Sequence, residues 1–379
     1  MVTRTGAVLP RSVATDDGIQ LVEEARPRYA MLKRLGEGAF GEVELCLDND
    51  IDRHVAVKRL KPDMQDPDTV SRFASEIQTV GQLEHPGIVP VHDVGLDERG
   101  FFFVMKYVEG DTLEHVVARL RAKDPVYVSR FSIDVRVEMF GQLCRAVMFA
   151  HSKGWVHRDI KPANVMVGPF GEVVLMDWGL AKQVGPNGRR DIIGSGGGPA
   201  PSAYGTMIGH AIGTPAYMSP EQARGEHDKT DARSDVYSLC AVFYVLLGLQ
   251  HYLKPKRNLD EILEAVKTER PMGAIAMHHK LEIPPEFAWI ISRGLEKDPD
   301  RRHSSAAALA QRVQAAIEGR GPVQCPCTGM KRVGGTWSRF IDRQPNLAIV
   351  LAGLLTVSAV FGVVSAVYEV VPAVLLIAR

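Results

Sequence analysis

The chain lacks an excess of charge of either sign, because its 379 residues contain 45 Lys and Arg and 45 Asp and Glu. Nothing in the overall charge argues for a nucleic acid partner, and we expect none; any electrostatic site must be local. It also lacks a continuous apolar run near its start, where charged residues such as Arg4, Arg11 and Asp16 interrupt residues 1–28. We therefore expect no secretory signal peptide and a cytosolic N-terminus.

Cysteine is scarce, with five residues in all. Cys46, Cys144 and Cys240 lie in apolar surroundings, which predicts buried free thiols and a reducing compartment. Cys325 and Cys327 flank a proline and could bind a metal ion or form a strained disulfide, but no second pair of ligands accompanies them. We favour a simple linker at this point of the chain.

Local patterns divide the chain into a lead-in, a β lobe and a helical lobe. Residues 1–28 show no sustained periodicity and are expected to be flexible. Short apolar runs then predict an antiparallel sheet interrupted by one helix, and longer helical periodicity follows, so the fold class is α+β. The expected strands cover residues 29–35, 42–47, 54–60, 88–94 and 101–107, and the expected helices cover residues 67–83, 112–121, 133–153, 234–247, 259–268, 286–295 and 304–318.

A glycine-rich stretch lies between the first two expected strands. Its glycines would let backbone amides approach a phosphate chain closely. By itself the stretch is equally compatible with a glycine-rich hairpin, and the strand on each side argues against a dinucleotide-binding turn, which opens a helix. The stretch comprises Leu35, Gly36, Glu37, Gly38, Ala39, Phe40, Gly41, Glu42 and Val43.

Lys58 ends the next apolar strand, where a solvated lysine would have no reason to point inward. A lysine that pairs with phosphates fits this position. Glu76 lies among apolar residues of the following helix and could pair with Lys58, although by itself it would be interpreted as a surface charge.

Four polar residues with complementary chemistry follow in order. Asp159 can accept or orient a hydroxyl proton, and Lys161 can neutralise a transferring phosphoryl group. Asn164 and Asp177 offer the oxygen ligands that Mg²⁺ prefers. These four residues follow a glycine-rich loop and Lys58, which is expected to point inward. This order and spacing indicate a site for phosphoryl transfer.

Together the motifs LGEGAFGEV, VAVK, HRDIKPANV and MDWG resemble the protein-kinase signature set over residues 29–318. The resemblance is to bacterial serine/threonine kinases of the eukaryotic-like family, and it implies a two-lobed protein kinase fold that binds ATP and Mg²⁺. Lys161 and Thr214 match the serine/threonine class rather than the tyrosine class.

The resemblance also assigns site residues. It implies that Asp159 is the catalytic base with Lys161 beside it, and that Asn164 and Asp177 hold Mg²⁺. Lys58 would hold the α- and β-phosphates and pair with Glu76. The adenine would be bound by Ala56, Met105, Tyr107, Val108 and Met166, with Met105 as gatekeeper and Tyr107 and Val108 as the hinge.

Two long-range contacts are implied in the helical lobe. Glu221, in SPE, should pair with Arg302, and Asp235 should brace the catalytic loop. The sequence departs from the family pattern at Trp178, which replaces a phenylalanine, and at Lys106, where an acidic residue is common. A long Gly-rich insert within residues 183–213 is expected to be a mobile loop.

The expected function is transfer of the γ-phosphoryl group of Mg-ATP to Ser or Thr hydroxyls of protein substrates. The alternative is an inactive pseudokinase that acts as a membrane-tethered, ATP-binding scaffold, and a tyrosine or small-molecule kinase is disfavoured by Lys161. A homodimer could serve autophosphorylation. Because Arg158 precedes the catalytic base, we expect activation by phosphorylation at Thr206, with a solvated loop residue as the alternative.

The tail predicts a membrane anchor. A basic linker at residues 319–346 precedes residues 347–367, which carry no charge and are long enough to span a bilayer. A buried core helix is the alternative, but such a helix has nothing to pack against after a complete domain. The basic flank places the kinase side in the cytoplasm, as a single-pass protein of the cell membrane. The apolar residues 368–379 are either interfacial or the start of a second span.

Overall fold

The computed structural model describes residues 6, 9–16, 18–22, 26–38, 41–184, 214–226, 228–253, 255 and 258–320, with isolated positions 329, 344, 347, 349 and 358. The chain divides into two compact units, Met1–Val313 and Gln314–Arg379. Almost all described residues belong to the first unit, which contains both lobes expected from the sequence.

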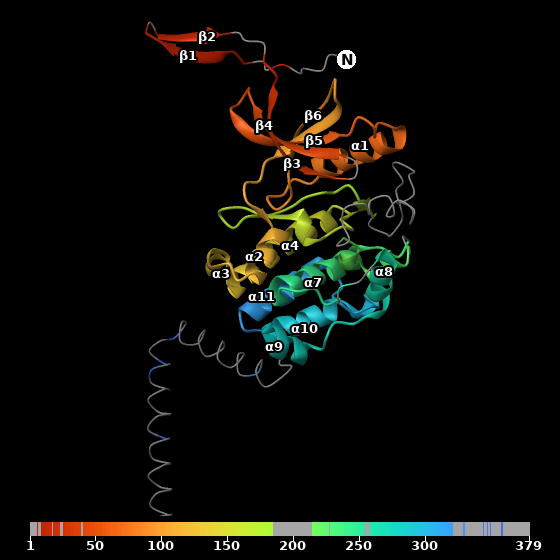
Figure 1. The fold of residues 1–379 in the computed structure, drawn as a ribbon. Helices are drawn as coiled ribbons and strands as arrows, with labels where there is room; N and C mark the ends of the chain where they lie inside the picture. Colours follow the sequence, from red (N-terminus) through yellow and green to blue (C-terminus); the bar gives the residue numbers. More distant parts are fainter. Residues whose placement is uncertain are drawn as a thin grey trace, which may run out of the picture. The chain divides into compact units, whose positions relative to one another are not determined.

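The small lobe is built on a five-stranded antiparallel sheet with the order β3-β4-β5-β7-β6. Side chains alternate across each strand, so Val55 and Val57 pack into one cluster while Leu60 joins Phe73 of α1 in another. Figure 1 shows α1 lying beside this sheet. The bounds are β3 (Tyr29–Glu37), β4 (Gly41–Asp48), β5 (Arg53–Leu60), α1 (Pro67–Gly81), β6 (Val91–Asp97) and β7 (Gly100–Lys106).

The lead-in differs from the expectation. Residues 1–28 were expected to lack regular structure because no periodicity marks them, but the structure places a hairpin there, with β1 (Arg11–Thr15) paired to β2 (Gly18–Val22). Gly18 adopts a φ of 121°, which suits the tight turn between the strands. The strands are only five residues long, and strands this short leave little periodic signal in a sequence.

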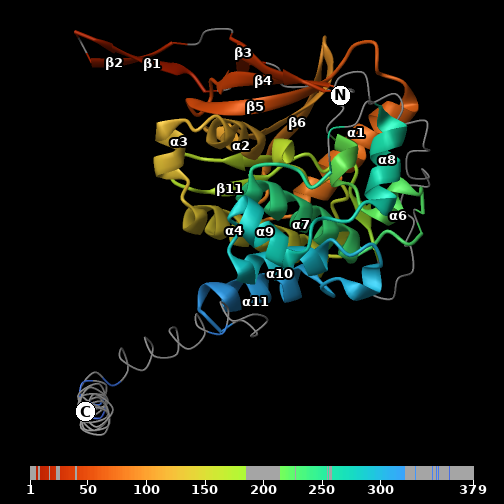
Figure 2. The same ribbon diagram turned by 60° about the horizontal axis from the view of Figure 1, so that its bottom comes forward.

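The large lobe is helical. Its centre is α7, which is almost wholly buried and packs against α4 and α10. Phe243 of α7 stacks on Phe140 of α4 with ring centroids 4.0 Å apart. Figure 2 shows these helices below the small lobe. The helices are α2 (Leu113–Arg121), α3 (Pro125–Arg130), α4 (Ile133–Ser152), α6 (Pro220–Ala223), α7 (Ala232–Gly248), α8 (Leu259–Thr268), α9 (Ala274–Leu281), α10 (Pro285–Gly294) and α11 (Ala306–Ile317).

Short strands connect the two lobes. The strands β8 (Asp111–Thr112), β10 (Val165–Val167) and β11 (Val173–Leu175) form one small sheet, and β9 (Trp155–Val156) pairs with β12 (Lys182–Gln183). Leu175 at the end of β11 also forms a parallel bridge with Ile88 of the small lobe. The loops between these strands therefore lie where the two lobes meet.

Three helices, α3, α6 and α9, were not expected. Asp124 caps α3 and Pro125 occupies its first position, which is a favourable start signal. All three helices are too short for a helical period to stand out in the sequence.

Cys46, Cys144 and Cys240 are buried free thiols, as predicted, while Cys325 and Cys327 lie outside the described residues. Most of the predicted span 347–367 also lies outside them. Within the described part of the chain, no helix is both long enough and apolar enough to cross a bilayer.

Candidate active site

Lys58 and Glu76 form an ion pair that links the sheet to α1. Lys58 shares its face of β5 with Leu60, and α1 covers that face. The Lys58 Nζ therefore reaches Glu76 Oε1 at 2.6 Å and lies 3.7 Å from Asp177 Oδ1. Burial lowers the pKa of Lys58, but the carboxylates of Glu76 and Asp177 outweigh burial and raise it. The predicted pairing is confirmed, and the lysine is held as a cation.

Asp159 lies at the centre of a hydrogen-bonded loop that follows β9. Lys161 Nζ donates to Asp159 Oδ2 at 2.8 Å, and Asn164 Nδ2 donates to the same oxygen at 2.9 Å. Asn164 also donates to the Asp159 main-chain carbonyl, which fixes the turn that enters the 3₁₀ helix η1 (Pro162–Asn164). The pKa of Asp159 is raised above its ordinary value because burial, which raises it, outweighs the positive charge of Lys161, which lowers it. Three of the predicted site residues are thus locked into one cluster.

Asp235, near the start of α7, braces this loop as expected. Its buried carboxylate accepts hydrogen bonds from the main-chain N–H groups of His157 and Arg158, each at 2.9 Å, and lies 2.7 Å from His151 Nε2. Burial raises the pKa of Asp235, but its hydrogen bond with His151 and the nearby charge outweigh burial and lower it. Arg158 has a φ of 67°, a conformation that costs energy in a non-glycine residue, so this bracing holds a strained turn in place.

Asp177 follows β11 and has a φ of 60°. Partial loss of hydration raises the pKa of Asp177, but the positive charges of Lys58 and Lys161 outweigh this effect and hold the pKa below its ordinary value. The side chain is about half exposed, at 48%, so the ionised carboxylate is accessible to a ligand. The lowered pKa and the exposure suit a carboxylate that binds a cation.

Trp178 fills the position next to Asp177. Its side chain is 1% exposed and meets the ring of His157 edge-on, with centroids 4.5 Å apart. His157 Nε2 donates to the Met176 carbonyl, and its Nδ1 accepts from the Asp159 N–H group. Trp178 is therefore buried in the lobe and supports the histidine that orients the catalytic loop.

The predicted pair of Glu221 and Arg302 is confirmed. Two parallel hydrogen bonds of 2.8 Å join the side chains, and Ser234 Oγ donates to the same carboxylate at 2.6 Å. Ser219 caps α6 through a capping box with Gln222, which fixes the start of the helix that carries Glu221.

The glycine-rich stretch forms the turn between β3 and β4. The Gly38 N–H donates to the Gly41 carbonyl at 2.7 Å. A side chain at Gly41 would bring its Cβ within 2.5 Å of the Arg59 carbonyl on β5, so only glycine fits there. Glu37 and Glu42 form ion pairs with neighbouring basic side chains, and Ala39 and Phe40 lie outside the described residues.

The residues predicted to bind adenine come from three strands and from the segment that follows β7. Ala56 on β5 lies opposite Met105 on β7. Tyr107 and Val108 follow β7 directly, and Met166 lies on β10, paired with Thr112 and Val174.

Some functional positions were not anticipated from the sequence, and some predicted positions lie outside the described residues. His151 and Gln222 were missed; His151 contacts Asp235, and Gln222 Nε2 donates to the Arg158 carbonyl at 2.8 Å. The capping-box spacing from Ser219 to Gln222 was an available signal, whereas nothing local marks His151. The predicted mobile loop covers residues 183–213. Gln183 instead belongs to β12 and pairs with Trp155, while residues 185–213, including Thr206, lie outside the described residues, as does the Thr214 side chain.

Comparison with known proteins agrees with this geometry. A family model described as a protein kinase domain matches residues 29–313. The serine/threonine-protein kinase PknD of Protochlamydia amoebophila is 32% identical over 307 residues, which cover 78% of this chain and 30% of that protein. A probable serine/threonine-protein kinase of Streptomyces coelicolor is 33% identical over 327 residues, which cover 85% of this chain and 44% of that protein. PknB of Mycolicibacterium smegmatis is 33% identical over 301 residues, covering 78% and 44%. The chain thus spans less than half the length of these relatives.

Proposed function

Because the chain belongs to the protein kinase family, we propose that it transfers the γ-phosphoryl group of ATP to Ser or Thr hydroxyl groups of proteins. The hydrogen-bonded cluster of Asp159, Lys161 and Asn164 carries this proposal. Its relatives are named serine/threonine kinases, and Lys161 lies two residues after the base, as in that class.

The chain's own residues act mainly by position and charge. Asp159 accepts the proton of the substrate hydroxyl, and its raised pKa makes it a better acceptor than an exposed carboxylate. Lys161, hydrogen-bonded to Asp159, neutralises charge on the transferring group. Lys58, fixed by Glu76, holds the α- and β-phosphates.

The polar residues also fit a divalent cation, for which we propose Mg²⁺. Asn164 uses its amide N–H groups on Asp159, which leaves its carbonyl oxygen as a ligand, and Asp177 offers an accessible carboxylate. The described residues contain no group of three or more His, Cys, Asp or Glu placed to hold a metal. One amide and one carboxylate suit Mg²⁺, which keeps water and phosphate oxygens as further ligands. When bound, it neutralises phosphate charge.

The nucleotide-binding roles of the remaining residues are part of the same proposal. Backbone groups of residues 35–43 cover the phosphates, and Ala56, Met105, Tyr107, Val108 and Met166 surround the adenine. In support, β5 and β7 place Ala56 and Met105 opposite each other on the sheet that also carries Lys58.

Replacing Asp159 with Asn tests the activity. The variant keeps the size of the side chain but not its basicity, so phosphoryl transfer should fall by a factor of about 100 or more while ATP binding stays near that of the parent. Transfer of radiolabelled phosphate to a generic protein substrate measures the first, and calorimetry the second. If the parent and the Asp159→Asn variant transfer phosphate equally slowly, the pseudokinase alternative is preferred. If the parent and the variant both transfer it rapidly, Asp159 is not the base.

We further propose that residues 1–28 form a lead-in and residues 29–318 the kinase domain, with a basic linker at 319–346, a transmembrane helix at 347–367 and an apolar tail at 368–379. The uncharged stretch of the sequence and its basic flank support a single pass through the cell membrane with the kinase in the cytoplasm. A chain truncated after Gly321 should be active and should remain in solution without detergent. If the full chain is also soluble without detergent, the anchor is wrong.

A further inference from the structure

A separate polar pocket of about 260 Å³ lies in the helical lobe, where α7, α10 and α11 meet the 3₁₀ helix η4 (Pro299–Arg301). It shares no lining residue with the proposed catalytic site. The side chains that carry charge or a titratable ring into it come from all four elements and from the turn after η4, and they are Arg233, Arg293, Asp300, Arg302, His303 and Arg312.

Two of the four arginines are already neutralised. Arg233 pairs with Asp231 and with Asp300, the one acidic residue in the pocket lining, and Arg302 is bound by Glu221. Arg293 and Arg312, by contrast, make no side-chain ion pair or hydrogen bond within the described part of the chain. Among the described residues, two positive charges of the pocket, those of Arg293 and Arg312, therefore have no anionic partner.

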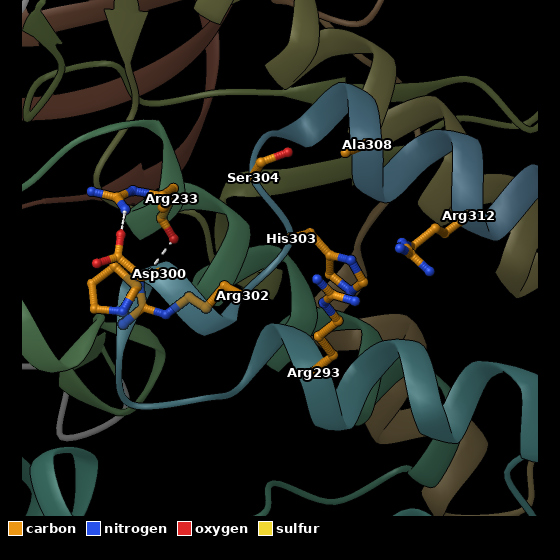
Figure 3. A pocket seen from close by; sticks show the side chains of 9 residues that line it. Arg233, Arg293, Asp300, Arg302, His303, Ser304, Ala308 and Arg312 are labelled. Atoms are coloured by element: carbon orange, nitrogen blue, oxygen red, sulfur yellow. Dashed lines mark hydrogen bonds and ion pairs between the residues drawn. The ribbon is translucent and has the colours of Figure 1, made fainter. Parts of the chain in front are cut away.

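The buried ring of His303 lies between these two arginines. In Figure 3, Arg293 rises from α10 toward this ring and Arg312 points to it from α11. His303 is 2% exposed, and its Nε2 donates to the Ile290 carbonyl at 2.9 Å. Its Nδ1 has no hydrogen-bond partner among the described residues. A buried polar atom without a partner is costly, so the pocket lacks a group that would satisfy it.

The partner of Nδ1 has to be a hydrogen-bond donor. The pKa of His303 is lowered to about 4, mainly by burial. The positive charges of Arg293 and Arg312 lower it further, and only the hydrogen bond to the Ile290 carbonyl raises it. The ring is therefore neutral near pH 7, with its proton on Nε2, and Nδ1 is an acceptor. A ligand that satisfies the whole pocket must present anionic oxygens to the arginines and an O–H group to the histidine.

We propose that this pocket binds a phosphate group that keeps one P–O–H. Two of its oxygens would accept charge-assisted hydrogen bonds from Arg293 and Arg312, and its hydroxyl would donate to His303 Nδ1. Inorganic phosphate meets this description at neutral pH, and so does a singly ionised phosphomonoester. Sulfate has the same shape and charge but no hydroxyl at this pH.

Calorimetric titration of the full chain with inorganic phosphate tests the site. We expect saturable binding that is weakened about tenfold or more by Arg293→Gln and by Arg312→Gln, because each removes a charge-assisted bond. Arg301→Gln is the matched control: Arg301 is exposed, lies next to the pocket and does not line it, so binding should be unchanged. The Arg293 and Arg312 residues are exposed, so these two variants should fold normally. Binding should persist in Lys58→Met, which excludes the proposed catalytic site.

Two further probes define the ligand. Sulfate should bind more weakly than phosphate, because it cannot donate to Nδ1. A phosphoserine-containing peptide that binds more tightly than inorganic phosphate identifies a phosphorylated residue as the source, and weaker binding identifies free phosphate. The absence of saturable phosphate binding, or equal affinity in the parent and both glutamine variants, would overturn the site, and equal affinity for sulfate would overturn the phosphate assignment.

Discussion

Replacement of Glu221 with Gln should destabilise the helical lobe strongly. Glu221 and Arg302 are each 2% exposed and are joined by two hydrogen bonds of 2.8 Å. The substitution leaves the Arg302 guanidinium buried without a counter-charge, and removing one partner of a buried pair costs about 3–5 kcal/mol. Breaking an exposed pair costs at most about 1 kcal/mol.

The matched control is Glu264→Gln, the same chemical change at an exposed pair with Lys267 on α8. Urea denaturation followed by circular dichroism measures the free energy of unfolding of both variants. We expect Glu221→Gln to lose several times more stability than Glu264→Gln. Equal losses in the two variants would show that the buried pair contributes no more than a surface one.

The same pair predicts a pH dependence. Burial raises the pKa of Glu221, but the hydrogen bonds and charge of Arg302 outweigh it and hold the pKa below its ordinary value of 4.5. A carboxylate with a lowered pKa contributes stability above its unfolded-state pKa and loses that stability as the pH falls through the folded-state value. The parent should therefore lose stability below about pH 4.5 more steeply than Glu221→Gln. Parallel curves for the two proteins would contradict this assignment.

Three further predictions concern the glycine-rich turn, the loop before Thr214 and phosphorylation between two copies of the chain. Gly41→Ala should lower the free energy of unfolding by about 1–3 kcal/mol, because its Cβ would lie 2.5 Å from the Arg59 carbonyl oxygen. Gly36→Ala is the control: no atom lies within 4 Å of its Cβ, so the free energy of unfolding should change little. Urea denaturation curves that coincide for the two variants would refute the packing argument. Incubation with Mg-ATP should phosphorylate residues 183–213, seen by mass spectrometry, and Thr206→Ala should lower activity well below that of the parent. An alanine variant as active as the parent would remove Thr206 as the switch. If phosphorylation occurs between two copies, its rate per molecule should rise with protein concentration.

The sequence by itself determined the residues that the chemistry needs. Asp159, Lys161 and Asn164 lie within six consecutive positions, so their hydrogen bonds are set by local turns that short motifs encode. The two lobes were also predictable, because strand and helix periods differ and the change of period falls near residue 110.

Only the tertiary structure decided which distant residues meet. His151 reaches Asp235 across 84 positions, and nothing in the sequence near either residue indicates the contact. Arg293, His303 and Arg312 belong to different elements and line one pocket only because the fold brings α10, α11 and the turn after η4 around the same space. Such contacts depend on packing geometry rather than on local periodicity, and for that reason the catalytic loop could be predicted from the sequence while the arginine pocket could not.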